Sequence, residues 1–273
     1  MPYCANKRIA VEYRKNIIAC CRNQCQVREG RAVKTIVSVS DFHIHDDSRL
    51  QKIEGFTREM DVLKPDVIVF LGDIGDPWEA TWDKIRDTQS WKVLGELGLR
   101  RRGQGLETVW INRNHDYSAK RNYLSGARLS SRPRRVDGFL FMHGWEFDWI
   151  WSGFDIIWNI PLLPGISRVA YWLSSTFPHL SIRLWACLRV LPCFNKETPS
   201  QQKARGAGDD WNRHVGLVHL RAMDYAKRKK VKLVIGHTHC QMLYDDLLAD
   251  DGDMSDSFSF LYIKDGKWEL RII

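Results

Sequence analysis

The sequence predicts an α/β fold in which two mixed β-sheets pack as a sandwich, flanked by helices and extended by an apolar helical insertion cap. Short apolar runs of strand length alternate with helical stretches early in the chain, and hairpin patterns follow later. Mixed sheets covered by helices are a layered arrangement that buries such elements. With 273 residues and 44% hydrophobic composition, the chain can form one large core that tolerates an insertion.

Five apolar, β-branched runs have the length and composition of buried strands. They are residues 35–40, 66–71, 107–112, 139–142 and 232–235. Residues 257–263 and 267–273 are alternating runs around Asp265-Gly266. Asp137-Gly138 likewise stands between the apolar residues Val136 and Phe139. An Asp-Gly pair between such runs is a strong hairpin signal, so both pairs are predicted to be hairpin turns.

Polar side chains that can bind metals follow each of the five predicted strands. They stand in the segments Asp41-Phe42-His43, Gly72-Asp73-Ile74-Gly75-Asp76, Asn114-His115-Asp116, His143-Gly144 and Gly236-His237-Thr238-His239. Five of the nine histidines fall in these segments, more than scattered strand-capping residues would give. In an extended chain, residues two apart point to one face, so Asp41 and His43 are expected to share one ion. The same spacing allows His237 and His239 to converge on a single ion.

In their order and residue types, these segments resemble the motifs of the calcineurin-like metallophosphoesterases over about residues 35 to 240. The family pattern is Asp-x-His, Gly-Asp-x-x-Asp, Gly-Asn-His-Asp, a lone His and Gly-His-x-His. The resemblance implies the metallophosphoesterase fold and a metal-dependent hydrolase. It also implies that one metal is held by Asp41, His43 and His239, that the other is held by Asn114, His143 and His237, and that Asp73 bridges them. His115 would be catalytic and paired with Asp76, for which a simple turn cap is the alternative.

The chemistry of a two-metal site explains these residue types. Two divalent ions about 3.5–4 Å apart can hold the attacking and leaving oxygens of a displacement, and they lower the pKa of bound water towards about 7. His115 is then expected to protonate the leaving oxygen, with Asp76 holding its ring. Imidazole, carboxylate and amide ligands favour manganese, iron, cobalt, nickel or zinc over magnesium or calcium. Manganese is the metal expected from the resemblance.

One position departs from the family pattern. Arg113 stands where the family has the glycine before Asn-His-Asp. Either the backbone differs locally at this turn, or the Arg113 guanidinium binds the substrate phosphate, for which its planar fork is suited.

Composition bounds the partner and the compartment. A net charge of +8 and a pI near 9.1 predict an anionic partner, which can be a phosphate-bearing substrate, nucleic acid or an anionic membrane surface. The seven cysteines lack Cys-x-x-Cys spacing and are expected to be mostly free thiols. No charged-then-apolar signal sequence opens the chain, so a cytoplasmic location is expected. Residues 1–32 precede the resemblance and are predicted to be an N-terminal extension.

An unusually apolar stretch lies between the fourth and fifth metal-binding segments. Residues 149–194 hold only four charged side chains, and prolines and Asp155 interrupt the apolar runs before the roughly 18 residues that a membrane-spanning helix needs. Residues 149–209 are therefore predicted to be a helical cap inserted into a catalytic domain of residues 33–148 and 210–273. Such a cap could hold an acyl chain, lie at a membrane interface or pack against another subunit.

The segment from His143 to Asp148, followed by this insertion, resembles the UDP-2,3-diacylglucosamine diphosphatase branch of the superfamily. The resemblance implies hydrolysis of a pyrophosphate bond in a lipid-linked nucleotide sugar, with release of UMP. An enzyme with such a cap is expected to be cytoplasmic and peripheral on the inner face of the membrane. Two alternatives stay open: a phosphodiesterase or phosphatase acting on soluble nucleotides or nucleic acid, and a non-catalytic interaction scaffold.

Overall fold

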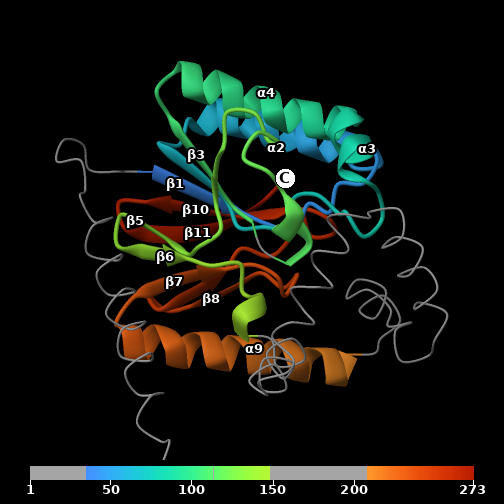
Figure 1. Cartoon of the computed structure of the whole chain (residues 1–273). Coiled ribbons are helices and arrows are strands. Elements are labelled where there is room, and N and C mark those ends of the chain that lie inside the picture. Colours follow the sequence, from blue (N-terminus) through green and yellow to red (C-terminus); the bar gives the residue numbers. More distant parts are fainter. Residues whose placement is uncertain (1–34, 113, 148–207) are drawn as a thin grey trace, which may run out of the picture. The chain divides into compact units, whose positions relative to one another are not determined.

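The computed structural model describes residues 35–112, 114–147 and 208–273, and Figure 1 labels most of its helices and strands. Two β-sheets lie at its centre. The six-stranded sheet contains, in spatial order, β11 (Lys267–Ile272), β10 (Ser259–Lys264), β1 (Thr35–Val39), β2 (Val67–Phe70), β3 (Glu107–Ile111) and β4 (Arg128–Ser130). The five-stranded sheet contains β5 (Arg134–Val136), β6 (Phe139–Phe141), β7 (Lys232–Ile235), β9 (Leu248–Asp250) and β8 (Met242–Tyr244).

Both sheets are mixed. In the first, β1 to β4 are parallel to one another, whereas β10 pairs antiparallel with β1. In the second, β6, β7 and β9 are parallel, and β5 and β8 pair antiparallel at the two edges. The prediction of two mixed sheets flanked by helices is confirmed, and each of the five apolar runs contains a strand.

Alternating side chains of the first sheet build two hydrophobic layers. In β2, Ile68 and Phe70 pack in the cluster that includes residues of α2 (Leu50–Leu63) and α4 (Gln89–Gly103), whereas Val67 and Val69 face the second sheet. All four side chains are buried. Parallel strands covered on both faces need apolar residues at every position, which explains the unbroken Val-Ile-Val-Phe sequence of β2.

The second sheet follows the same alternation. In β7, Val234 packs against the first sheet, whereas Leu233 and Ile235 pack with Val218 and Ala222 of α9 (Gly208–Lys229). The layers of the described catalytic region are therefore α2 with α4, the six-stranded sheet, the five-stranded sheet and α9, from top to bottom in Figure 1.

Both predicted Asp-Gly turns form hairpins. Asp265 and Gly266 join β10 to β11 with φ angles of 49° and 75°, and Asp137 and Gly138 join β5 to β6 with φ angles of 45° and 83°. Positive φ at both central residues is the geometry of the type I′ turn, whose twist matches that of antiparallel strands.

Helix α4 is capped and tightly packed. The Thr88 side chain accepts a hydrogen bond from the Trp91 N–H at 3.1 Å and so caps the first turn. Trp91 and Leu94, three residues apart, are buried on one face. A Cβ atom at Gly98 would lie 2.2 Å from the Ser125 carbonyl oxygen, so glycine allows the loop before β4 to run against the helix.

Several predictions of domain organisation concern other parts of the chain. The predicted N-terminal extension (1–32) and nearly all of the predicted cap (149–207) lie outside the described residues, so the domain boundaries stay predictions. Of the described helices, none is long and apolar enough to cross a membrane. Cys240 is partly buried, and the other six cysteines lie outside the described residues, so the expectation of mostly free thiols stays a prediction.

Candidate metal centre

The predicted ligands gather where the parallel strands of both sheets end. The loops after β1, β2, β6 and β7 carry, in that order, Asp41 and His43, Asp73 and Asp76, His143, and His237 and His239. Backbone hydrogen bonds join the first two loops, because the Asp41 N–H donates to the Gly72 carbonyl at 3.1 Å and the His43 N–H donates to the Asp73 carbonyl at 2.9 Å. The His237 N–H donates to Asp41 Oδ2 at 2.8 Å, which joins the two sheets at the site.

The first cluster consists of Asp41, His43 and His239, whose ligand atoms lie within 4.8 Å of one another. Asp41 Oδ1 is 3.7 Å from His43 Nε2 and 3.6 Å from His239 Nε2. The two imidazole rings stack with centroids 5.4 Å apart. One oxygen and two nitrogens therefore converge, and they belong to the residues that the resemblance assigns to one metal.

The second cluster consists of Asp73, His143 and His237. His143 Nε2 is 3.3 Å from Asp73 Oδ2, and the ring centroids of His143 and His237 are 5.1 Å apart. A Cβ atom at Gly72 would lie 3.0 Å from His143 Nδ1, which accounts for the glycine before Asp73. Asn114 begins the 3₁₀ helix η1 (Asn114–Ser118), but its side chain lies outside the described part. Its ligand role, and the bridging role of Asp73, stay predictions.

The structure corrects one argument made from strand periodicity. That argument assumed an extended backbone for Asp41 and His43, and it allowed His237 and His239 to converge on a single ion. The four residues have φ angles of 56°, 46°, 74° and 53°, in the left-handed region, and the two C-terminal histidines belong to different clusters. Left-handed residues reverse the chain locally, so side-chain alternation no longer applies. Such conformations are uncommon outside glycine and often occur at functional sites.

Buried polar atoms show that both clusters suit a cation. Asp41 Oδ1 and both ring nitrogens of His143 are buried and have no hydrogen-bond partner among the described residues. Buried polar atoms normally have partners, and a divalent ion satisfies a carboxylate oxygen and an imidazole nitrogen alike. A donor set of nitrogen and oxygen without thiolate suits a divalent transition metal. The residues present therefore fit a two-metal site.

Burial and neighbouring charges shift the pKa values of the carboxyl and imidazole groups in both clusters. Burial alone would raise the pKa of Asp73, but the positive charges of His143 and His115 lower it to about 2. Burial would lower the pKa of His143, yet Asp73 raises it to about 10. Burial also opposes ionisation of Asp41, but the neighbouring histidines, led by His239, bring its pKa far below the ordinary value. The carboxylates stay ionised, and their negative charge favours the cationic form of the neighbouring groups.

His115 and Asp76 form a hydrogen-bonded pair beside the clusters. His115 Nδ1 lies 2.9 Å from Asp76 Oδ1, which also accepts the Trp78 backbone N–H at 3.1 Å. Burial lowers the pKa of His115, but the charges of Asp76 and Asp73 raise it above the ordinary value. The indole of Trp78 lies against the His115 ring, with centroids 3.9 Å apart. Sequence reasoning did not identify Trp78, because no local motif distinguishes it from other tryptophans.

Asp116 supports the site, although sequence reasoning assigned it no role. Its fully buried carboxylate accepts the backbone N–H groups of Ile74 at 2.9 Å and Gly75 at 3.0 Å, and the Trp110 indole N–H at 2.7 Å. Burial and the charge of Asp73 raise the pKa of Asp116 to about 7. Because Ile74 and Gly75 follow Asp73 directly, Asp116 holds the loop that carries this predicted ligand.

A second buried network supports the loop after β7. The Thr238 hydroxyl donates to Asp250 Oδ2 at 2.7 Å, and His219 Nε2 of α9 lies 2.8 Å from the same oxygen. All three residues are buried, and burial raises the pKa of Asp250. Thr238 stands between His237 and His239, so the network connects α9 to the loop that supplies one histidine to each cluster.

Asp251 joins the two sheets close to this network. Its carboxylate accepts hydroxyl hydrogen bonds from Ser38 at 2.6 Å and Ser40 at 2.8 Å, both in or just after β1. The carboxylate is fully buried, and burial raises its pKa well above the ordinary value. The start of the loop that carries Asp41 is thereby held against the end of β9.

Arg113 lies outside the described residues, so the two interpretations of this position stay open. Its neighbour Asn112 continues the sheet edge, since the Asn112 N–H donates to the Ser130 carbonyl at 3.0 Å.

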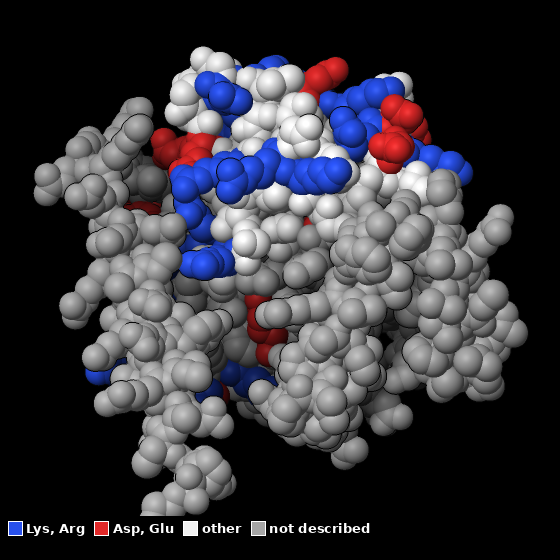
Figure 2. Space-filling view, viewed as in Figure 1, with Lys and Arg blue, Asp and Glu red and all other residues white. Residues whose placement is uncertain are grey.

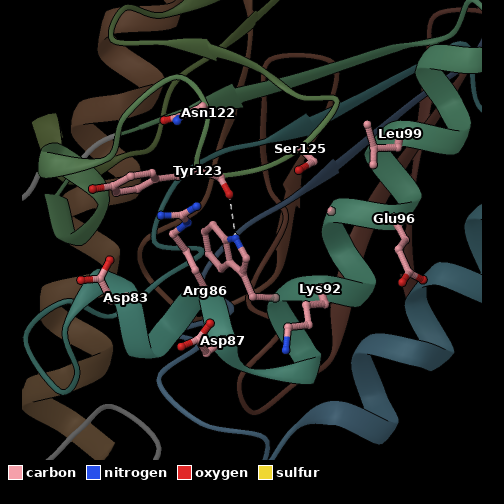
Figure 3. Close-up of a pocket in the computed structure, with 11 residues that line it drawn as sticks. Asp83, Arg86, Asp87, Lys92, Glu96, Leu99, Asn122, Tyr123 and Ser125 are labelled. Atoms are coloured by element: carbon pink, nitrogen blue, oxygen red, sulfur yellow. Dashed lines mark hydrogen bonds between the residues drawn. The ribbon is translucent and has the colours of Figure 1, made fainter.

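A cavity of about 540 Å³ lies between α3 (Trp82–Asp87), α4 and the loop before β4 (Figure 3). Its lining includes Arg86, Lys92 and Tyr123, and the Trp91 indole N–H donates to the Tyr123 carbonyl at 2.8 Å. No predicted metal ligand lines this cavity. The convergence of ligand atoms, and not the cavity, therefore locates the candidate site.

The sequence of the whole site region matches a known family. The calcineurin-like phosphoesterase family matches residues 34–241, which is 208 of the 273 residues. The chain belongs to the calcineurin-like phosphoesterase family. The prediction of a metal-dependent hydrolase is thereby confirmed at the level of the family, whereas the narrower UDP-2,3-diacylglucosamine branch stays a prediction.

Solved structures give weaker likenesses. The nuclease MPE of Pseudomonas putida has 19% identity over 40% of this chain and 53% of its own, with a TM-score of 0.31, so the chain spans about half of that protein. A predicted phosphoesterase from Streptococcus pneumoniae TIGR4 has 13% identity over 89% and 99%, with a TM-score of 0.32. An archaeal phosphodiesterase has 10% identity over 88% and 99%, with a TM-score of 0.36. All three TM-scores are low. Comparison with curated proteins found no match.

Proposed function

We propose that this protein is a dinuclear metal-dependent phosphoesterase that hydrolyses a pyrophosphate bond in a lipid-linked nucleotide sugar, such as UDP-2,3-diacylglucosamine, with release of UMP. The observation that carries the reaction class is the pair of carboxylate and imidazole clusters around Asp41 and Asp73, next to the hydrogen-bonded His115 and Asp76. Two divalent ions bound there would polarise the phosphoryl group and supply hydroxide near neutral pH.

The ligand assignment combines the two clusters with the family pattern. Asp41, His43 and His239 would hold one ion, and Asp73, Asn114, His143 and His237 the other, with Asp73 shared between both. Manganese is the first candidate, with iron, cobalt, nickel and zinc as alternatives, because imidazole and carboxylate ligands suit all of them.

His115 would act on the leaving oxygen. The Nδ1–H of His115 donates a hydrogen bond to Asp76 Oδ1, so Nε2 is the nitrogen that can give a proton to the substrate. Burial lowers the pKa of His115, but the carboxylates of Asp76 and Asp73 raise it above the ordinary value, which favours the protonated ring that a general acid needs. Trp78 restricts the ring from one side. Arg113 is a candidate contact for the substrate phosphate.

The lipid part of the proposal rests on the sequence of the insertion. Residues 149–194 are rich in large apolar side chains and hold only four charged ones, a composition suited to acyl chains or to a membrane interface. A cytoplasmic enzyme, peripheral on the inner face of the membrane, would meet such a substrate there. The net charge of +8 favours a second candidate, a phosphodiesterase or phosphatase acting on soluble nucleotides or nucleic acid.

Turnover on three substrates separates these candidates. UDP-2,3-diacylglucosamine, a soluble nucleotide diphosphate and bis-p-nitrophenyl phosphate are each assayed with manganese and with chelator. We expect manganese-dependent release of UMP from the lipid substrate. Activity on the soluble compounds alone would replace the proposed substrate by the second candidate. Less than about one bound metal, with no activity on any substrate after manganese addition, would contradict the enzyme assignment and favour a scaffold.

A further inference from the structure

A strongly basic segment follows the loop of the candidate site. Between Asp116 and Asp137 the sequence contains no acidic residue. Residues 120–135, called the basic segment below, carry six basic side chains: Lys120, Arg121, Arg128, Arg132, Arg134 and Arg135. The basic segment thus has a net charge of +6, which is large beside the net charge of +8 for the whole chain. Such a concentration of one sign creates a local field that attracts an anionic partner.

Strand pairing places the basic segment at the rim of the metal clusters. Its first strand, β4, pairs with β3 so that Ser130 lies opposite Ile111, at the end of β3. Its second strand, β5, pairs with β6 so that Arg134 lies opposite Phe141, two residues before His143. The connection between β4 and β5 therefore crosses from one sheet to the other at the edge where both sheets carry predicted ligands.

The basic side chains are accessible. Five of the six are exposed: Lys120, Arg121, Arg128, Arg132 and Arg135. Figure 2 shows Lys and Arg side chains gathered in a band on the upper part of this face of the protein. Arg134 is partly buried, and its Nε has no hydrogen-bond partner among the described residues. Burial and the positive charge of Arg128 lower the pKa of Arg134, so basic groups already repel one another here. Glu107 offsets part of this charge, 3.7 Å from Arg128.

We propose that the basic segment binds the anionic surface of a lipid membrane and turns the rim of the metal clusters towards it. The choice of partner rests on the proposed function, because a lipid-linked substrate is met at a membrane surface. Each lysine or arginine close to an anionic bilayer strengthens binding by about fivefold at physiological salt.

Nucleic acid, the other extended polyanion, matches the segment less well. Single strands bind where aromatic side chains are free to stack on bases. The ring of Tyr123, in the basic segment, already lies 5.0 Å from the Trp82 ring and is covered by the Arg86 guanidinium at 5.0 Å. The segment thus offers charge without a free stacking surface, which favours lipid headgroups.

Vesicle sedimentation with the full chain tests the proposal. Vesicles of phosphatidylcholine are compared with vesicles that also contain phosphatidylglycerol. The test variant combines Arg121→Gln, Arg132→Gln and Arg135→Gln. The matched control combines Lys227→Gln, Arg228→Gln and Lys229→Gln, which removes three exposed charges from the end of α9, next to the start of β7 and thus at the edge opposite the site.

We expect wild type and control to bind the anionic vesicles alike, and the test variant to bind about a hundredfold more weakly, from three factors of about five. Equal partition of the test variant and wild type, or equal binding of wild type to both kinds of vesicle, would overturn the proposal. Binding of an oligonucleotide that the test variant loses, without selective vesicle binding, would overturn it in favour of nucleic acid.

Two further measurements test the proposal if the variant misfolds, and separate it from the proposed function. If circular dichroism shows that the test variant is misfolded, wild-type partition is measured at about 1 M salt, where the Debye length is about 3 Å, and undiminished binding rejects the proposal. Partition needs no turnover. Selective partition without cleavage of the lipid substrate therefore rejects the proposed function alone, and cleavage in detergent without selective partition rejects the membrane proposal alone.

Discussion

Two replacements of Asp116, by alanine and by asparagine, should destabilise the protein to different degrees. Asp116 Oδ2 accepts the Ile74 N–H and the Trp110 indole N–H, and Oδ1 accepts the Gly75 N–H. Asp116→Ala leaves three buried donors without an acceptor, at about 1–3 kcal/mol each. Removal of a buried carboxylate, whose pKa burial raises to about 7, offsets part of this cost. We therefore expect a loss of about 3 kcal/mol, near the lower end of that sum.

Asp116→Asn is the informative second variant. An amide oxygen in the place of Oδ2 keeps two of the three hydrogen bonds, whereas the amide nitrogen faces the Gly75 N–H, donor against donor. The expected loss is about 1–3 kcal/mol, the cost of one unsatisfied buried group.

Urea unfolding in the presence of chelator measures both variants without a contribution from bound metal. Glu96→Ala, at an exposed position of α4, is the control and should lie within about 0.5 kcal/mol of wild type. The free energies of unfolding should follow the order wild type, Asp116→Asn, Asp116→Ala. An alanine variant as stable as the control, or an asparagine variant as unstable as the alanine variant, would refute the assigned hydrogen-bond roles.

Three further predictions concern chemistry and pH. His115→Ala should keep its metal content, measured by elemental analysis, but lose about 10²–10⁴-fold in turnover if His115 is the general acid; near-wild-type turnover would remove it from the mechanism. Asp73→Ala should lose both metals as well as activity, and retention of two ions would exclude the bridging role. Burial raises the pKa of Asp251 in the folded state, so the folded protein binds this proton more tightly and the stability of wild type should fall as pH rises above about 4. Asp251→Asn should show a weaker fall in chelator-treated urea titrations, and parallel pH profiles would count against this assignment.

The strands and hairpins were predictable because their signals are local. The Val-Ile-Val-Phe run of β2 and the Asp-Gly turns act through neighbouring residues, and the strand ends in turn located the metal-binding segments. Short edge strands such as β8 were not predicted. Three residues carry too little periodicity, and their pairing depends on partners that are distant in the chain.

The supporting residues of the site were not predictable for the same reason. Asp116 meets Ile74 across 42 positions, and Ser38 meets Asp251 across 213, so neither contact has a local pattern. The strand-periodicity argument for Asp41 and His43 was wrong about the backbone, since tertiary contacts hold both residues in left-handed conformations. The family resemblance grouped His237 and His239 with different partners, as the two clusters do, because motifs retain information that periodicity lacks.

The hydrogen bond from the His237 N–H to Asp41, 196 positions earlier, has a consequence for biosynthesis. During translation Asp41 and His43 leave the ribosome long before His239 exists, and β1 also waits for β10 to pair along its second edge. Chains generally fold by domains as they emerge, and long-range pairing is slow. The first cluster can therefore be completed only after synthesis has passed His239. Metal binding at this cluster is then a late step of assembly. A polypeptide that has not yet reached His239 lacks a full set of ligands with which to bind the wrong ion.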